Sequence, residues 1–178
     1  MNSGMELEFR YRFEAAHRFL AGSEKCKTPH GHSWYATLSF SAMDQDLDSN
    51  QMSQEFSRLK APWKEFILET ADHSYLHHFN DSLAKTLRAE VDENYRLLAF
   101  PGEPTTELIA SLFLKKALIM YSESPIKPFQ IYIEETQTNR LRMTPKALEQ
   151  IESQLQLAAP KYQEAWWNQS KPSSRNSF

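Results

Sequence analysis

Residues 7–13 limit most strongly how this chain can fold. They read Leu-Glu-Phe-Arg-Tyr-Arg-Phe, with apolar and charged side chains in strict alternation. A period of two places all apolar side chains on one face of a strand and all charged ones on the other. The segment is therefore predicted to be a half-buried strand that packs one face against a core.

Periodicity predicts the next elements. A second strand, rich in aromatic and small residues, is expected over 33–42, after a loop over 18–31. Apolar residues then recur at helical spacing from 52 to 67, where Pro62 predicts either a kink or two helical segments that meet there. A cleaner helix is expected over 105–121, because a proline and a Thr-rich start precede its apolar face.

The remaining strands follow this helix. Strands are predicted over 129–136 and 139–143, joined by a tight turn around Gln137-Thr138. The element order is then ββααββ, which makes the fold class α+β. A further helix is expected over 146–167, followed by a polar, Ser-rich tail that we expect to be flexible.

Composition excludes several classes of protein. A length of 178 residues suits one domain, and a net charge of -3 argues against a general nucleic-acid-binding surface. No apolar run approaches the roughly 18 residues of a membrane span, and no signal-peptide pattern is present. A single cysteine is compatible with a reducing compartment, so a cytoplasmic location is expected. Only four glycines argue against a Gly-rich phosphate loop.

Three histidines form a candidate metal site. In a strand, His30 and His32 point to the same face, with only Gly31 between them. His17 follows the first strand and could lie near the end of a neighbouring strand. Three imidazoles without a fourth protein ligand nearby are typical of a catalytic zinc site, which keeps one position open. A His-x-His pattern alone is weak evidence for a metal site, so the prediction depends on which other functional residues lie near it.

Cys26 has two interpretations. Near a metal or a base its thiol could act as a nucleophile or proton acceptor, whereas a single cysteine is more commonly a small buried apolar residue. Its polar neighbours, Glu24 to Thr28, argue against burial, and Lys25 and Lys27 would favour a thiolate.

Three other polar groups have both a functional and a structural interpretation. Asp72 could orient His73 as a general base, or it could cap a turn beside a half-exposed imidazole. Glu135, at a strand end, could accept two parallel N–H bonds from a planar heterocycle, or it could be solvated. Thr106 and Glu107 follow Pro104-Thr105 and are explained first by helix initiation.

Together these residues resemble the 6-pyruvoyl-tetrahydropterin synthases and their bacterial relatives, the 6-carboxytetrahydropterin synthases of the queuosine pathway. The resemblance runs in order from about residue 7 to 143. Its pieces are Phe13-Glu14-Ala15-Ala16-His17, Cys26, His30-Gly31-His32, Glu55-Phe56 with Leu59-Lys60, Asp72-His73 with Leu76, Pro104-Thr105-Thr106-Glu107 and Glu135-Thr136. Each piece is short, but the ordered set is specific.

The resemblance implies a fold and an assembly. The family has the T-fold, a four-stranded antiparallel sheet with two helices on one face, and forms homohexamers with active sites between subunits. Here the T-fold domain would span 1–144, with a C-terminal helical extension over 145–168 and a flexible tail over 169–178. The stretch 81–103 is longer than the family's usual connection, and the extra C-terminal helix is not part of its usual core.

The resemblance also implies roles for single residues. Zn²⁺ would be bound by His17, His30 and His32, and protons would be handled by Cys26, Asp72 and His73. Glu135 would anchor the pterin ring, with contributions from Thr106 and Glu107. The substrate would be 7,8-dihydroneopterin triphosphate, and Arg18, Lys25 and Lys27 are candidates for holding its triphosphate.

The spacing of the cysteine separates subfamilies. The queuosine-pathway enzymes have Cys-x-x-x-His-Gly-His, and this chain has Cys26-Lys27-Thr28-Pro29-His30. The expected activity is therefore that of a 6-carboxytetrahydropterin synthase, which releases triphosphate and acetaldehyde. The alternatives are a 6-pyruvoyl-tetrahydropterin synthase or another pterin side-chain lyase, and a non-catalytic protein that binds zinc or a pterin.

Overall fold

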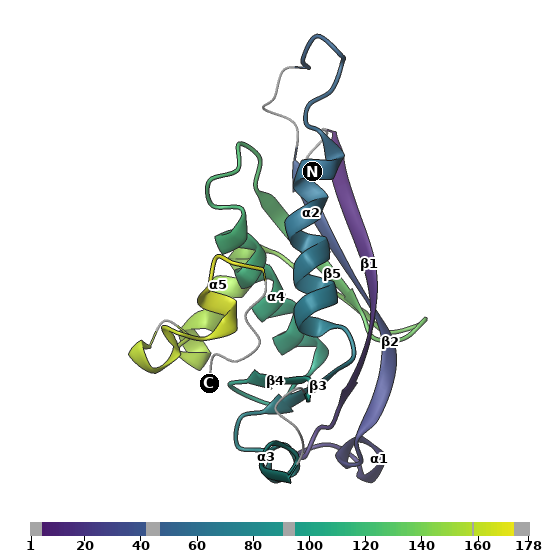
Figure 1. The fold of residues 1–178 in the computed structure, drawn as a ribbon, viewed down its shortest axis with the longest axis vertical. Helices are drawn as coiled ribbons and strands as arrows, with labels where there is room; N and C mark the ends of the chain where they lie inside the picture. Colours follow the sequence, from purple (N-terminus) through teal and green to yellow (C-terminus); the bar gives the residue numbers. More distant parts are fainter. Residues whose placement is uncertain (1–4, 42–46, 91–94, 158, 173–178) are drawn as a thin grey trace.

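Two long antiparallel strands form the centre of the molecule (Figure 1). The computed structural model describes residues 5–41, 47–90, 95–157 and 159–172. Strand β1 (Glu6–His17) pairs with β2 (His30–Ser41) over its whole length, from Glu6 opposite Ser41 to His17 opposite His30. Both strands were predicted, and both are longer than the alternating pattern alone indicated.

The sheet has six strands in the order β4-β3-β1-β2-β5-β6. On the β2 side, β5 (Pro128–Glu134) and β6 (Arg140–Met143) continue the antiparallel pairing, as predicted. On the β1 side, β3 (Ser74–His78) and β4 (Leu97–Phe100) add two parallel strands. The expected sheet of four antiparallel strands is therefore wrong, because the sheet is mixed. Neither added strand shows a period of two, since both are short and almost entirely buried.

The long connection over 81–103 accounts for part of this difference. It contains helix α3 (Ser82–Glu90) and strand β4. Helix α3 packs in a small separate cluster in which Tyr75, Ala84 and Leu97 are buried. Leu76, the next residue of β3, belongs instead to the main core. Because successive strand residues face opposite ways, α3 covers the sheet face opposite the main core.

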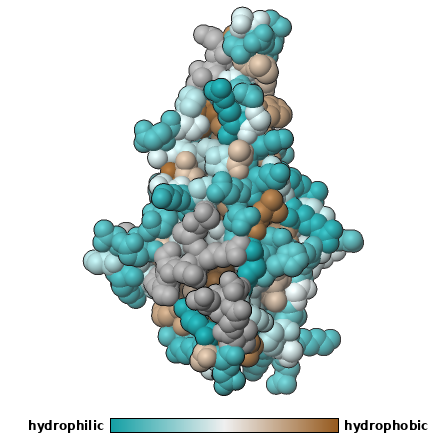
Figure 2. Space-filling model, in the orientation of Figure 1, coloured by the Kyte–Doolittle hydropathy of each residue, from teal (hydrophilic) through white to brown (hydrophobic). Residues whose placement is uncertain are grey.

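Helices α2 (Phe56–Phe66) and α4 (Thr106–Met120) cover the other face of the sheet, as expected for two helices on one face (Figure 1). Between helices and sheet, aromatic rings interlock: Phe13 stacks on Trp34 at 6.1 Å, and Phe66 meets Phe113 edge-on at 5.0 Å. Each such side chain contributes about 1.5–3 kcal/mol when fully buried. The outer surface in Figure 2 is mainly hydrophilic, with hydrophobic residues in small separate patches.

The ends of the helices show where the predictions were accurate. Thr105 caps α4, accepting a hydrogen bond from the Leu108 N–H, so this helix begins and ends as predicted. Helix α2 passes through Pro62 without ending, so of the two predicted alternatives, a kink or two segments that meet at Pro62, the second is not found. The α-helical geometry changes instead at Ile67, where the π-helix η1 (Ile67–Ala71) continues the chain.

In the described part of the chain, no helix is both long enough and apolar enough to cross a membrane.

The C-terminal segment is only partly helical. Helix α5 (Pro145–Leu155) ends where Gln156 adopts a left-handed conformation, so the helix expected over 146–167 is too long. Two short 3₁₀ helices follow, η2 (Pro160–Tyr162) and η3 (Trp166–Asn168). Trp166 and Trp167 are buried in the same core as the sheet.

Residues 169–172 continue this packing. Lys116 of α4 is fully buried, and its ammonium group donates to the carbonyls of Trp166, Gln169 and Lys171 at 2.9, 2.7 and 2.6 Å. The start of the expected tail is therefore held against α4, while residues 173–178 lie outside the described part of the chain.

Candidate metal centre

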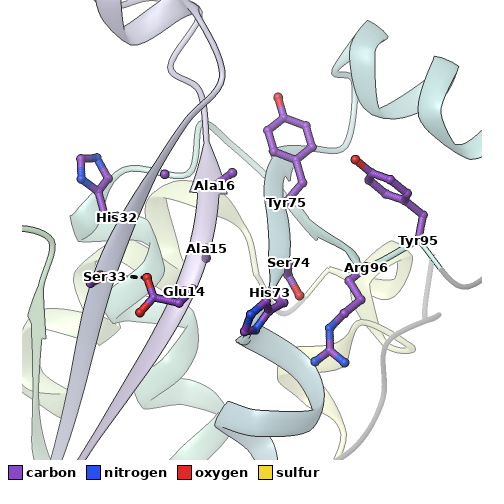
Figure 3. Close-up of a pocket in the computed structure, with 11 residues that line it drawn as sticks. Glu14, Ala15, Ala16, His32, Ser33, His73, Ser74, Tyr75, Tyr95 and Arg96 are labelled. Carbon is purple, nitrogen blue, oxygen red and sulfur yellow. Dashed lines mark hydrogen bonds between the residues drawn. The ribbon is translucent and has the colours of Figure 1, made fainter.

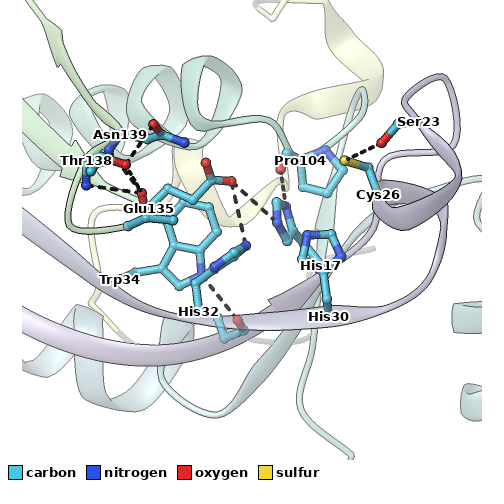
Figure 4. Close-up of polar contacts among 12 residues, drawn as sticks. His17, Ser23, Cys26, His30, His32, Trp34, Pro104, Glu135, Thr138 and Asn139 are labelled. Carbon is cyan, nitrogen blue, oxygen red and sulfur yellow. Dashed lines mark hydrogen bonds and ion pairs between the residues drawn. The ribbon is translucent and has the colours of Figure 1, made fainter.

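The register of the β1–β2 ladder brings three imidazoles together. His17 lies directly opposite His30, and His32 lies opposite Ala15 on the same face. One ring nitrogen from each histidine lies within 4.8 Å of the other two, and the three form a group that could hold a metal ion. Figure 4 shows the rings converging at the end of the hairpin.

Backbone carbonyls fix the orientation of two of these rings. His17 Nδ1 donates to the carbonyl of Pro104 at 2.9 Å, and His30 Nδ1 donates to that of Thr28 at 2.8 Å. Because a carbonyl only accepts, the proton is on Nδ1 and Nε2 is free to ligate a metal. His17 Nε2 is buried and has no hydrogen-bond partner, so a metal ion would satisfy it.

Burial favours the neutral form of two of the imidazoles, those of His17 and His32. Desolvation lowers the pKa of His17 and of His32, in each case as the largest cause. Metals bind the neutral imidazole, so this shift favours ligation. Trp34 lies beneath the rings, edge-on to His17 at 5.1 Å and to His32 at 5.4 Å, and donates from its indole to the Ala15 carbonyl. The residues present therefore fit a zinc ion.

Glu135 faces the same cluster. It follows β5 directly, and its backbone N–H donates to Asn139 across the turn, at 3.0 Å. Its carboxylate oxygen Oε1 lies 3.6 Å from His17 Nε2 and 3.9 Å from His32 Nε2. The carboxylate points toward the histidines and not into bulk solvent (Figure 4), which argues against the interpretation as a solvated strand end.

Cys26 lies in a short helix close to the cluster in sequence. Helix α1 (Glu24–Lys27) follows a tight loop in which the Phe19 N–H donates to the Cys26 carbonyl. A side chain at Gly22 would come within 2.5 Å of the Phe19 ring, so the loop needs glycine there. The thiol is partly exposed and lies 3.3 Å from the Ser23 hydroxyl. In the view of Figure 4 it lies toward His17 and His30.

Asp72 and His73 form a hydrogen-bonded pair, as one interpretation of the sequence required. His73 Nδ1 donates to Asp72 Oδ2 at 2.8 Å, while Oδ1 accepts the backbone N–H of Glu14 at 2.8 Å. His73 has a φ of 56°, which is uncommon for a residue other than glycine. Strained backbone of this kind concentrates at functional sites.

This pair lies on the sheet face opposite the three histidines. The His73 side chain lines a cavity of about 620 Å³ together with Glu14 and Ser33, which alternate with the cluster-side residues of β1 and β2. In Figure 3 the His32 side chain extends from β2 and the His73 side chain lies beyond β1, next to β3, and His32 also lines this cavity. Tyr95 and Arg96, just before β4, line the same cavity and had no signal in the sequence.

Three residues predicted to contact the substrate lie in different surroundings. Thr106 and Glu107 begin α4, two and three residues after Pro104, whose carbonyl contacts His17. Neither side chain hydrogen-bonds to the histidines within the described residues. The Arg18 guanidinium forms a bidentate pair with the buried Asp81, which also accepts from the Tyr75 hydroxyl. Arg18 is therefore paired with Asp81 in this structure, and a role in holding triphosphate stays a prediction.

Comparisons with known proteins point to one family. A family model described as 6-pyruvoyl tetrahydropterin synthase matches residues 6–146. A 6-carboxy-5,6,7,8-tetrahydropterin synthase of Aquifex aeolicus is 30% identical over 133 residues, which cover 64% of this chain and 80% of that protein. The enzyme of the same name from Rickettsia felis is 28% identical over 104 residues, covering 57% of this chain and 72% of that protein.

Solved structures show the same fold at low sequence identity. An uncharacterized protein of Wolinella succinogenes superposes with a TM-score of 0.66 at 19% identity, covering 79% of this chain and 98% of that one. A 6-pyruvoyl tetrahydropterin synthase of Plasmodium vivax superposes with a TM-score of 0.53 at 15% identity, covering 78% and 97%.

Proposed function

The chain belongs to the 6-pyruvoyl tetrahydropterin synthase family, and we propose that it is a zinc-dependent 6-carboxy-5,6,7,8-tetrahydropterin synthase. It would convert 7,8-dihydroneopterin triphosphate and water to 6-carboxytetrahydropterin, acetaldehyde and triphosphate, a reaction of queuosine biosynthesis. The observation that carries the proposal is the cluster of His17, His30 and His32. The names of the Aquifex and Rickettsia relatives and the spacing of Cys26 to His30 favour the carboxy-forming reaction.

The three histidines would hold the metal through their Nε2 atoms. The Pro104 and Thr28 carbonyls keep the His17 and His30 rings in the required tautomer. When bound, zinc would supply a Lewis acid that lowers the pKa of the substrate's side-chain hydroxyls and stabilises developing negative charge. Glu135 would accept two N–H bonds from the pterin ring, which places the side chain of the pterin at the cluster.

Two groups of the chain would move protons. The Cys26 thiol would exchange a proton with one carbon of the substrate side chain. His73 would exchange one on the other side, with its free Nε2 as the reacting atom, because Nδ1 donates to Asp72. Triphosphate leaves by elimination, and proton transfers turn the side-chain carbon next to the ring into a carbonyl carbon. Water then adds to this carbon and its bond to the next carbon breaks, so that it stays on the ring as the carboxylate while the other two carbons leave as acetaldehyde.

The cluster of three histidines and the Asp72–His73 pair lie on opposite faces of the sheet, so one protomer does not bring these two groups together. We therefore propose a homo-oligomer, a hexamer by resemblance to the family, in which His73 of one chain completes the metal site of another. The exposed His73 side chain, 71% accessible, is available for such a contact.

The decisive experiment is incubation of the purified protein with 7,8-dihydroneopterin triphosphate and identification of the products by mass spectrometry. Release of acetaldehyde with 6-carboxytetrahydropterin is the expected result. Triphosphate release without acetaldehyde would instead indicate a pyruvoyl-forming synthase. Bound pterin without turnover would indicate a non-catalytic binding protein and would contradict the proposal.

A further inference from the structure

The position of Glu135 is not explained by a role toward the pterin alone. Its Oε1 atom lies 3.6 Å from His17 Nε2 and 3.9 Å from His32 Nε2. These separations are longer than an N–H···O hydrogen bond, and no hydrogen bond joins the carboxylate to either ring. The carboxylate nevertheless points at the two nitrogens that would ligate a metal.

Without a cation between them, these atoms would repel one another. His17 Nδ1 carries the proton, since it donates to the Pro104 carbonyl. Nε2 therefore presents a lone pair, and it is buried without a partner. A carboxylate oxygen facing that lone pair in a partly dry site is unfavourable, because both carry negative partial charge. A metal ion removes this conflict, since every converging atom then becomes a donor to it.

The separations of Oε1 from His17 and His32 approach those of ligands around one ion, although the group of ligand atoms within 4.8 Å of one another contains the three histidines alone. In a tetrahedral site with metal–ligand bonds of about 2.0–2.1 Å, neighbouring ligand atoms lie roughly 3.3 Å apart. The separations of Oε1 from the two imidazole nitrogens exceed this value by only a few tenths of an ångström. To join the three histidines as a ligand, the Glu135 carboxylate would have to move closer to the cluster.

We propose that Glu135 is a fourth, exchangeable protein ligand of the metal, which leaves when a pterin binds. The inference rests on the proposed function, because it takes zinc as the metal and a pterin as the competitor. One carboxylate cannot fully serve both, since the N–H groups of a pterin and a metal ion compete for the same lone pairs. Pterin binding would thus vacate a coordination position at the moment when the substrate side chain needs it, and it would keep that position occupied at other times.

Metal affinity tests the ligand assignment directly. Glu135→Gln keeps the shape of the side chain but removes its charge, and Glu134→Gln is the matched control. Glu134 is the preceding residue, and its carboxylate accepts from Arg10 on the other face of the sheet. Glu135→Gln should bind Zn²⁺ at least about 10-fold more weakly in competition with a chromophoric chelator, and Glu134→Gln should match wild type. The visible absorption of the cobalt-loaded protein should shift only in Glu135→Gln.

The effect of zinc on pterin binding, and of pterin on zinc binding, tests whether Glu135 exchanges between the two. Unsubstituted pterin, which has no side-chain hydroxyls, should bind the zinc-loaded wild-type protein at least about 10-fold more weakly than the metal-free protein, and zinc should be weakened by pterin to the same extent. Equal pterin affinity in the two forms would overturn the exchange. Equal zinc affinity and equal cobalt spectra in wild type and Glu135→Gln would overturn the ligand assignment. If acetaldehyde is released but zinc binding ignores Glu135, this inference alone fails; if zinc binding depends on Glu135 but no acetaldehyde forms, the proposed reaction alone fails.

Discussion

At the residue scale, the metal cluster depends on contacts that the backbone makes. Two of its rings are held by carbonyls, Pro104 for His17 and Thr28 for His30, and not by acidic side chains. These two imidazoles are therefore oriented before a metal arrives, and loss of one of the three rings removes one of the three histidine ligands.

His30→Ala should lower the zinc content of the purified protein well below one ion per chain. A three-histidine site that loses one ligand should bind zinc more weakly by more than the roughly 10–100-fold typical of an outer contact. Elemental analysis after dialysis measures this directly. A variant that still carries one zinc per chain would disprove the ligand assignment.

Cys26→Ala should lose activity without losing zinc. Because the thiol is assigned to proton transfer and not to the metal, the zinc content should stay at the wild-type value. Turnover should fall by about 10²–10⁴-fold, the usual contribution of a positioned acid or base. Near-full activity of this variant in the acetaldehyde assay would show that Cys26 has no proton-transfer role.

At the scale of elements, the buried ammonium group of Lys116 binds the C-terminal segment over residues 166–171. The fully buried Lys116 donates to three carbonyls of residues 166–171. Burial lowers the pKa of Lys116 to about 8, below its ordinary value of 10.5. Between these two values the folded protein has lost a proton that the unfolded chain still holds. Unfolding then takes up a proton, so stability rises with pH in this window.

Lys116→Met should abolish this rise. From pH 8 to 9.5, the free energy of unfolding of the wild type should increase relative to that of Lys116→Met by about 1.5 kcal/mol. Denaturant titrations at several pH values measure the difference. Lys60→Met, on the exposed surface of α2, should run parallel to wild type; a parallel curve for Lys116→Met as well would contradict the assignment.

The same scale shows what the sequence could predict. The β1–β2 hairpin and α4 carry strong signals, because alternation and a Thr cap are local properties. Strands β3 and β4 carry none, since a short strand buried on both faces looks like any apolar run. In the site, the three histidines could be predicted from their spacing. The Pro104 carbonyl and the Arg18–Asp81 pair could not, because these contacts join segments 87 and 63 residues apart.

At the scale of the whole molecule, the proposed active site combines the metal cluster of one chain with the Asp72–His73 pair of another, because the two groups lie on opposite faces of the sheet. A mixture of two inactive variants should therefore regain activity. His30→Ala supplies an intact Asp72–His73 pair, and His73→Ala supplies an intact metal cluster. In randomly reassembled oligomers about a quarter of the sites receive both intact halves.

The test is to unfold and refold the two variants together and to compare acetaldehyde release with that of each variant alone. Recovery of about a quarter of wild-type activity is expected from that statistical mixing. No recovery, although size-exclusion chromatography shows mixed oligomers, would show that each chain builds its site alone.

The β1–β2 ladder that places His17 opposite His30 also places Phe13 opposite Trp34 in the core. If β2 slipped by one residue against β1, His30, His32 and Trp34 would turn to the opposite face, away from His17 and Phe13. Chains that misalign the hairpin during folding therefore gain neither a packed core nor a bound metal ion. A metal ion held by the three histidines would therefore stabilise only the register that also buries these aromatic residues.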